Sequence, residues 1–160
     1  DLRFTNMHPF RHIAPMQHVL SLTQVGIRSL RTAVEEHEDS LADGNKVVTM
    51  RDFLDHGPQG VANSVPKDAR VYVSIDIDVL DLPLIPGCVS AEPEGMSYAQ
   101  LRDTLEAIAA HADVVGFDLV EVNPPMDIAT GITSYLAAHT MIEFLGFICM
   151  QQRWLDRHPR

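Results

Sequence analysis

Two aspartates spaced two residues apart carry the clearest chemistry in the sequence. Asp76 and Asp78 fall within residues 71–79, where apolar residues at odd positions alternate with more polar ones, as in a β-strand. We expect both side chains to project from the same face, because successive side chains of a strand alternate. Two buried carboxylates on one face repel each other and lose hydration unless a cation compensates them. The pair therefore predicts a divalent-metal site.

The ligand types narrow the choice of metal. Carboxylate and water ligands favour magnesium, calcium or manganese, and added imidazole ligands shift the preference toward manganese, iron or zinc. Spacing alone leaves another interpretation open: one aspartate caps the following loop and the other is exposed at the strand end, since aspartate is common in turns.

Strand-like and helix-like segments alternate along the chain. We expect strands at residues 23–28, 46–50, 71–79 and 114–122, helices at 32–41, 97–109 and 128–154, and a short helix or irregular connection at 51–62. Ser97 and Gln100 form a capping-box pattern, and Asp127 is a candidate N-cap. Strands joined by helical crossovers imply a mainly parallel sheet covered by helices, a three-layer α/β/α domain. Sites in such sheets lie outside the carboxyl ends of the strands, near Asp78 and Glu121.

Composition places the chain among soluble globular proteins. Its 160 residues suit one domain, 46% are apolar and 21% are charged, and the net charge is −10. The acidic charges are scattered and no basic face is evident, which argues against nucleic acid as a partner.

The cysteines and the longest apolar run indicate in which cellular compartment the protein is expected. Cys88 and Cys149 are far apart and form no CxxC motif, which argues against a disulfide framework or a thiolate zinc site and fits a reducing cytoplasm. The longest strongly apolar run, residues 144–150, is shorter than the roughly 20 residues of a membrane span. We therefore expect a cytoplasmic protein with no membrane partner.

A longer motif surrounds the aspartate pair. Residues 74–78 read Ser-Ile-Asp-Ile-Asp and are followed by Asp81, by Pro86-Gly87 and by Gly95. This pattern is similar to the third signature of the ureohydrolase family, which includes arginases, agmatinases and formiminoglutamases. The sequence departs from it at Leu82, where the family usually has proline, and at residues 88–91, where many members have Thr-Gly-Thr-Pro. The departures leave the metal positions intact and bear on substrate identity.

The resemblance implies roles for four of these residues. Asp76 and Asp78 would ligate a pair of manganese ions, and Ser90 aligns with a threonine that contacts the amidine group of the substrate. Residues 117–124 resemble the next family block, in which Glu121 would accept hydrogen bonds from the substrate's guanidinium. A turn serine at position 90 and a buried ion pair of Glu121 with an arginine are the structural alternatives.

Two further roles concern the start of the chain. Residues 6–10, Asn-Met-His-Pro-Phe, resemble the loop after the family's Asp-x-His-x-Asp strand, where His8 would act as a proton shuttle. Asp1 is either the last aspartate of that motif, and so a third metal ligand, or simply a free N-terminal residue.

The resemblance also implies an arginase-like fold of which residues 1–160 form the C-terminal portion of a single domain. The earlier Gly-Gly-Asp-His block and the first part of the Asp-x-His-x-Asp motif are missing. We therefore expect the isolated chain to lack a complete two-metal site and to have weak or no activity. By the same resemblance the protein is expected to form a homo-oligomer, a trimer or hexamer.

The implied function is manganese-dependent hydrolysis of a linear amidine such as agmatine, arginine or a guanidino acid, with release of urea. Two metals would lower the pKa of a shared water, so that a metal-bridged hydroxide is available near neutral pH. The sequence after Asn6 lacks the longer polar loop that arginases use for an α-amino acid. This difference favours an agmatinase-like or guanidino-acid enzyme over an arginase. Two alternatives are formiminoglutamase-type hydrolysis and a truncated, non-catalytic module that acts in oligomerisation.

Overall fold

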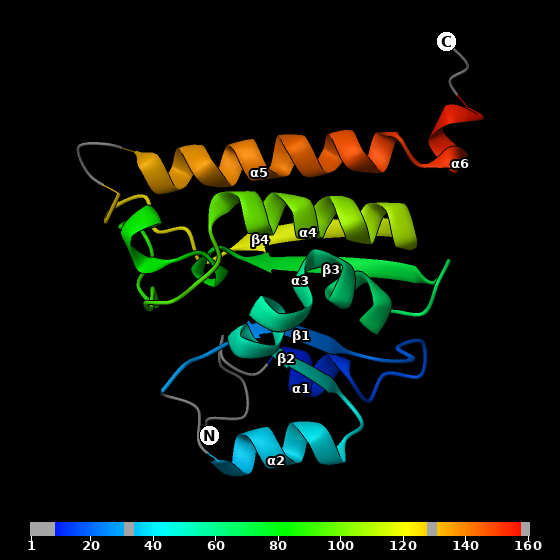
Figure 1. The fold of residues 1–160 in the computed structure, drawn as a ribbon, viewed down its shortest axis with the longest axis horizontal. Helices are drawn as coiled ribbons and strands as arrows, with labels where there is room; N and C mark the ends of the chain where they lie inside the picture. Colours follow the sequence, from blue (N-terminus) through cyan, green and yellow to red (C-terminus); the bar gives the residue numbers. More distant parts are fainter. Residues whose placement is uncertain (1–8, 31–33, 128–130, 158–160) are drawn as a thin grey trace.

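Two βαβ units form the body of the structure, a computed structural model that describes residues 9–30, 34–127 and 131–157 (Figure 1). The first unit consists of β1 (Thr23–Ile27), α2 (Val34–Ala42) and β2 (Lys46–Thr49). The second consists of β3 (Arg70–Asp76), α4 (Tyr98–His111) and β4 (Asp113–Val120). The remaining helices are α1 (Pro9–Ile13), α3 (Met50–Ser64), which joins the units, α5 (Ile132–Cys149) and α6 (Gln152–Leu155).

Both strand pairs are parallel, which confirms the predicted α/β class. Within the described residues they form two separate two-stranded sheets, β1 with β2 and β3 with β4. The register of the second sheet places Ser74 beside Asp118 and Asp76 beside Val120. Because parallel strands end at the same edge of a sheet, the residues that follow β3 and β4 meet there.

Helices α4 and α5 pack against the β3–β4 sheet and lie along each other, and α3 packs against α4 and against β1 and β2 (Figure 1). Apolar side chains of the sheet point into this layer, where Phe117 and Phe144 meet edge to face with their ring centroids 5.0 Å apart. Phe53, Ile77 and Phe144 are among the fully buried side chains of the core. The hydrophobic contact between helices and sheet therefore fixes the strands whose ends carry the aspartates.

The helix starts follow from local sequence. The predicted capping box at Ser97 and Gln100 is confirmed, and Thr49 and Asp52 form a second box at the start of α3. Residues 51–62, for which a short helix or an irregular connection was expected, belong to α3, which is kinked at Gly57 (φ 65°). The kink precedes Pro58, whose missing N–H cannot continue the helical hydrogen bonds.

All four predicted strands were too long at their carboxyl ends, those at residues 23–28 and 46–50 by one residue each. The strand expected at residues 71–79 ends at Asp76, and Ile77–Val79 forms a 3₁₀ turn, η1. The Asp76 carboxylate accepts a 3.0 Å hydrogen bond from the N–H of Asp78 and so stabilises this turn. The argument that strand alternation places both aspartates on one face was therefore wrong. The strand expected at 114–122 ends at Val120.

The last predicted helix, residues 128–154, also differs. Helix α5 spans Ile132–Cys149, α6 follows after a break, and Gly131 rather than Asp127 stands at the N-cap. Asp127 still stabilises the helix start, because its carboxylate accepts hydrogen bonds from the N–H groups of Thr133 and Ser134 at 3.2 and 2.8 Å.

The expectation that no segment is long and apolar enough to cross a membrane was wrong. With 18 residues and a mean hydropathy of 1.3, helix α5 is long and apolar enough to cross a membrane by length and composition. The core helix of a soluble protein can be as long and as apolar but is mostly buried, whereas 28% of α5 is buried, including Thr133, Ala137, Phe144 and Ile148. Length and composition alone therefore do not assign α5 to a membrane.

Candidate functional site

A cavity of about 230 Å³ lies where the carboxyl ends of β1 and β3 approach each other. Its lining consists of Gly26, Ile27, Arg28, Ser29, Asp76, Asp78, Ser90 and Glu92. Three residues predicted to act together, Asp76, Asp78 and Ser90, thus line one cavity. Because Asp76 ends β3 and Asp78 lies in η1, the turn rather than strand alternation brings the two carboxylates to it.

Asp76 has the electrostatics of a cation ligand. The pKa of its carboxyl group is raised to about 7, first by burial and then by the negative charges of Asp78 and Glu121. The hydrogen bond from the Asp78 N–H acts in the opposite direction. A divalent cation would relieve this burial cost and repulsion, and carboxylates are ligands that manganese accepts. The donor set of this cavity therefore fits the predicted metal.

The aspartate pair is only part of a metal site. Within residues 9–30, 34–127 and 131–157, no group of three or more His, Cys, Asp or Glu side chains is placed to hold an ion. Two carboxylates alone leave most positions around a manganese ion to water or to other ligands. Asp1 and His8 lie outside the described residues, so their roles remain predictions.

Glu121 stands directly after β4 in a backbone conformation that favours glycine, with φ at 67°. A left-handed conformation costs a non-glycine residue about 1 to 2 kcal/mol, and such strain is often found at functional sites. Glu121 does not line the cavity, but its charge acts on Asp76. Within the described part of the chain it forms no ion pair with an arginine, and Arg3, Arg31 and Arg160 lie outside that part.

The loop between η1 and α4 owes its shape to the motif's aspartate and glycines. The Asp81 carboxylate accepts a 3.0 Å hydrogen bond from the N–H of Gly95, and Met96 donates its N–H to the Val79 carbonyl at 2.8 Å. A Cβ atom at Gly95 would lie 2.5 Å from the carbonyl carbon of Leu80, so only glycine fits. The base of the loop is thereby closed against the end of β3.

The middle of the same loop is held by the segment after β4. Asn123 donates its N–H to the Gly87 carbonyl at 2.8 Å, and Gly87 donates its own N–H to Thr133 Oγ1 at 2.8 Å. A Cβ atom at Gly87 would lie 2.5 Å from the Cβ of Asp127. This anchoring places Ser90 at the cavity, where its hydroxyl lies 3.5 Å from the sulfur of Cys88.

Ser74, the first residue of the motif, has a structural contact that the sequence did not reveal. Its hydroxyl donates a 2.7 Å hydrogen bond to Asp118 Oδ1 on β4, and Tyr72 donates to Asp118 Oδ2 at 3.0 Å. These bonds cross between the paired strands and do not involve the cavity. Ser74 therefore fixes β3 against β4 rather than taking part in chemistry.

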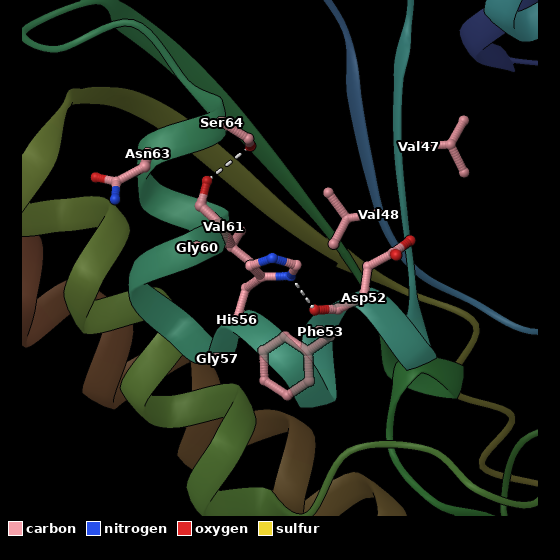
Figure 2. A pocket seen from close by; sticks show the side chains of 10 residues that line it. All are labelled: Val47, Val48, Asp52, Phe53, His56, Gly57, Gly60, Val61, Asn63 and Ser64. Atoms are coloured by element: carbon pink, nitrogen blue, oxygen red, sulfur yellow. Dashed lines mark hydrogen bonds between the residues drawn. The ribbon is translucent and has the colours of Figure 1, made fainter.

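A larger cavity, of about 550 Å³, lies between β2 and α3 (Figure 2). It contains none of the predicted site residues. Two of its polar side chains already make hydrogen bonds at the start of α3. The Asp52 carboxylate accepts a hydrogen bond from the Thr49 N–H in the capping box, and the His56 ring nitrogen Nδ1 lies 2.8 Å from the Asp52 carbonyl oxygen. We therefore place the candidate site at the smaller cavity, because the paired carboxylates lie there.

Arg28 is one of the five cavity residues for which the sequence predicted no role, with Gly26, Ile27, Ser29 and Glu92. It follows β1 directly, and the rule that sites lie at the carboxyl ends of parallel strands could have identified it. The structure thus defines a parallel α/β protein with a carboxylate-lined cavity at its strand ends.

Comparison with known proteins identifies the family. The profile of the arginase family matches residues 2–146, and the chain belongs to this family. The formimidoylglutamase of Halalkalibacterium halodurans is 31% identical over 153 residues, which cover 91% of this chain and 48% of that protein. The guanidinopropionase of Pseudomonas aeruginosa is 30% identical over 154 residues, covering 89% and 48%. The chain therefore spans about half the length of these relatives.

The solved structures confirm the predicted arginase-like fold. The formimidoylglutamase of Bacillus subtilis superposes with a TM-score of 0.79 at 25% identity, covering 95% of this chain and 50% of the other. The arginase of Medicago truncatula gives a TM-score of 0.71 at 30% identity, with coverages of 89% and 43%.

Proposed function

We propose that the complete natural protein is a manganese-dependent hydrolase of a linear amidine, with Asp76 and Asp78 among its metal ligands. The observation that carries this proposal is the pair of carboxylates in one cavity, one of them with a pKa raised to about 7 by burial. Membership of the arginase family, whose members similar to this chain include a guanidinopropionase and arginases, supports the same chemistry.

The remaining roles belong to residues around this pair. Glu121 would accept hydrogen bonds from the cationic amidine, since a carboxylate pairs well with a planar guanidinium. The Ser90 hydroxyl faces the same cavity and would contact the amidine nitrogen atoms. Bound manganese would supply Lewis acidity that makes water nucleophilic near neutral pH. His8 would carry a proton to the leaving amine.

A formimino group is the second candidate for the reacting amidine. The relative from H. halodurans and the structure from B. subtilis are both formimidoylglutamases, and the latter matches 95% of this chain. The two candidates share the metal chemistry and differ in the released product. Hydrolysis of a guanidino group releases urea, whereas hydrolysis of a formimino group releases formamide.

One assay tests the proposal and separates these substrates. The complete protein, loaded with manganese, would be incubated with agmatine, arginine, guanidinobutyrate, guanidinopropionate and formiminoglutamate, and urea and formamide would be measured. We expect one substrate to be hydrolysed, and we expect hydrolysis to stop after chelation and in Asp76→Asn. Activity that is independent of manganese, or unchanged in Asp76→Asn, would contradict the metal role. No hydrolysis of any of these compounds would favour the non-catalytic module.

A further inference from the structure

Arg28 joins three segments of the candidate site through backbone carbonyl groups. Its Nη2 donates to the carbonyl oxygens of Asp78 at 2.8 Å, Glu92 at 2.9 Å and Leu80 at 3.2 Å. Its Nε donates to the Pro93 carbonyl at 3.0 Å, and Nη1 lies 3.5 Å from the Gly26 carbonyl oxygen. The accepting residues belong to the end of β1, to η1 and the residue after it, and to the loop before α4.

These contacts join parts of the protein that the sheets leave separate. In the described residues β1 and β3 belong to different two-stranded sheets, yet their carboxyl ends both line the cavity. The loop before α4 is closed onto β3 by its own hydrogen bonds, such as that from Met96 N–H to the Val79 carbonyl. Arg28 adds a connection to the end of β1, beside the 2.8 Å hydrogen bond between the Ser29 hydroxyl and Glu92 Oε1.

The contacts use all three nitrogen atoms of the guanidinium. Nη2 has two N–H groups for three carbonyl oxygens, so one N–H is shared between two of them, while Nε and Nη1 face the carbonyls of Pro93 and Gly26. A lysine ammonium has its three donors on one nitrogen and cannot also reach the carbonyls that Nε and Nη1 face. The carbonyl of Asp78 is held directly, and a fixed backbone at residue 78 fixes where its carboxylate enters the cavity.

We propose that Arg28 is a positioning residue, which holds the Asp78 turn and the loop around Glu92 in place against the end of β1. It does so through hydrogen bonds to backbone carbonyls and without touching substrate. Its loss would displace one of the two carboxylates, and small displacements of catalytic groups are costly: about 1 Å can reduce a rate about 100-fold. This inference rests on the proposed function for its effect on catalysis, but its effect on the loop is independent of that function.

The test uses the complete protein with Arg28→Met, Arg28→Lys and the control Lys46→Met. Lys46 also donates to a backbone carbonyl, that of Ser64, away from the cavity. We expect Arg28→Met to weaken manganese binding and to lower kcat about 10- to 100-fold, as losses of supporting groups around metal ligands do, while KM changes less than about threefold. Arg28→Lys should recover part of both losses, and Lys46→Met should show neither.

Amide hydrogen exchange provides the readout that does not depend on activity. We expect exchange at residues 78–93 to accelerate about tenfold in Arg28→Met, with exchange in α4 unchanged, because only the held segment opens. If the wild type neither binds manganese nor hydrolyses an amidine, the proposed function is wrong. The positioning role of Arg28 is then tested by the hydrogen-exchange comparison alone. Exchange, metal affinity and kcat in Arg28→Met equal to those of Lys46→Met would overturn the positioning role.

Discussion

The Asp76 carboxylate accepts a 3.0 Å hydrogen bond from the backbone N–H of Asp78, and this bond stabilises the turn that brings the second carboxylate to the cavity. One aspartate is therefore both a cap for local structure and a candidate ligand. The capping part of the alternative interpretation is compatible with metal binding, because capping uses one oxygen of Asp76 and a carboxylate offers several acceptor positions. The other part is not observed, since Asp78 is half-buried rather than exposed.

Removing the charge at position 76 should stabilise the metal-free protein. The buried Asp76 carboxylate is repelled by Asp78 and Glu121 above its raised pKa of about 7, and asparagine keeps an oxygen for the Asp78 N–H. We expect Asp76→Asn to raise the free energy of unfolding at pH 8 by about 1 to 2 kcal/mol, a value reduced for partial exposure to water.

Urea unfolding of the metal-free protein at pH 8 would measure this difference. Asp55→Asn on the exposed surface of α3 removes the same charge and should change stability by less than about 0.5 kcal/mol. Equal effects of the two substitutions would show that Asp76 carries no special electrostatic cost.

The motif glycines should tolerate no side chain. At Gly87 and Gly95 an added Cβ would lie 2.5 Å from Asp127 Cβ and from the Leu80 carbonyl carbon, respectively. We expect each alanine substitution to lower the free energy of unfolding by about 1 to 3 kcal/mol, as overpacking does. Thermal or urea unfolding checks this.

Gly146 supplies the matched control. It lies within α5, and an added Cβ there would meet nothing within 4 Å. Alanine favours the helix interior, so Gly146→Ala should raise the free energy of unfolding by about 0.5 to 1 kcal/mol. A destabilisation of Gly146→Ala like that of Gly87→Ala would show that the close contacts are not the cause.

Substitution of Glu121 by glycine should weaken substrate binding and leave the stability of the protein almost unchanged. In Glu121→Gly, loss of the Cβ relieves the strain of the left-handed conformation at φ 67°, which stabilises the protein. Glycine also loses more backbone entropy on folding, which destabilises it, so the free energy of unfolding should stay within about 1 kcal/mol of the wild type. The KM of the complete protein for its amidine should rise at least about tenfold, because a charged hydrogen bond to the substrate is lost.

Glu94→Gly is the control for that substitution. Glu94 also has a positive φ, 60°, and like Glu121 it does not line the cavity, but no role with the substrate is proposed for it. Its substitution should leave KM unchanged. A KM for Glu121→Gly within twofold of that for Glu94→Gly would remove Glu121 from the substrate site.

Tyr98 should make the contact between α4 and α5 sensitive to high pH. Burial and a hydrogen bond donated to Glu143 raise the pKa of Tyr98 to about 12. The folded protein therefore holds this proton more tightly than the unfolded chain, whose tyrosine has a pKa near 10. Stability should fall as pH rises from about 10 to 12, since the unfolded state loses the proton first.

Urea midpoints measured from pH 8 to 11.5 would test this. Tyr98→Phe should have a shallower decline than the wild type over that range. Tyr135→Phe, which changes an exposed tyrosine of α5, should follow the wild type. Identical declines for all three proteins would contradict the role of Tyr98.

Some features of the fold follow from local sequence patterns, whereas others depend on contacts between distant residues. Alternation at residues 71–76 and the Ser97–Gln100 box predicted β3 and α4 because these patterns are local. The end of β3 was missed because the Asp76 cap competes with strand continuation, and alternation at Ile77 and Val79 continues through the turn. The role of Arg28 depends on carbonyl groups up to 65 residues away, which no local pattern reveals.

Calorimetric titration of the metal-free complete protein with manganese would show whether Asp76 and Asp78 are metal ligands. We expect the wild type to bind two manganese ions per chain, and we expect Asp76→Asn and Asp78→Asn each to lose at least one of these ions or to bind it at least about tenfold more weakly. Unchanged stoichiometry and affinity in both variants, or no binding by the wild type, would contradict the assignment of these aspartates as metal ligands.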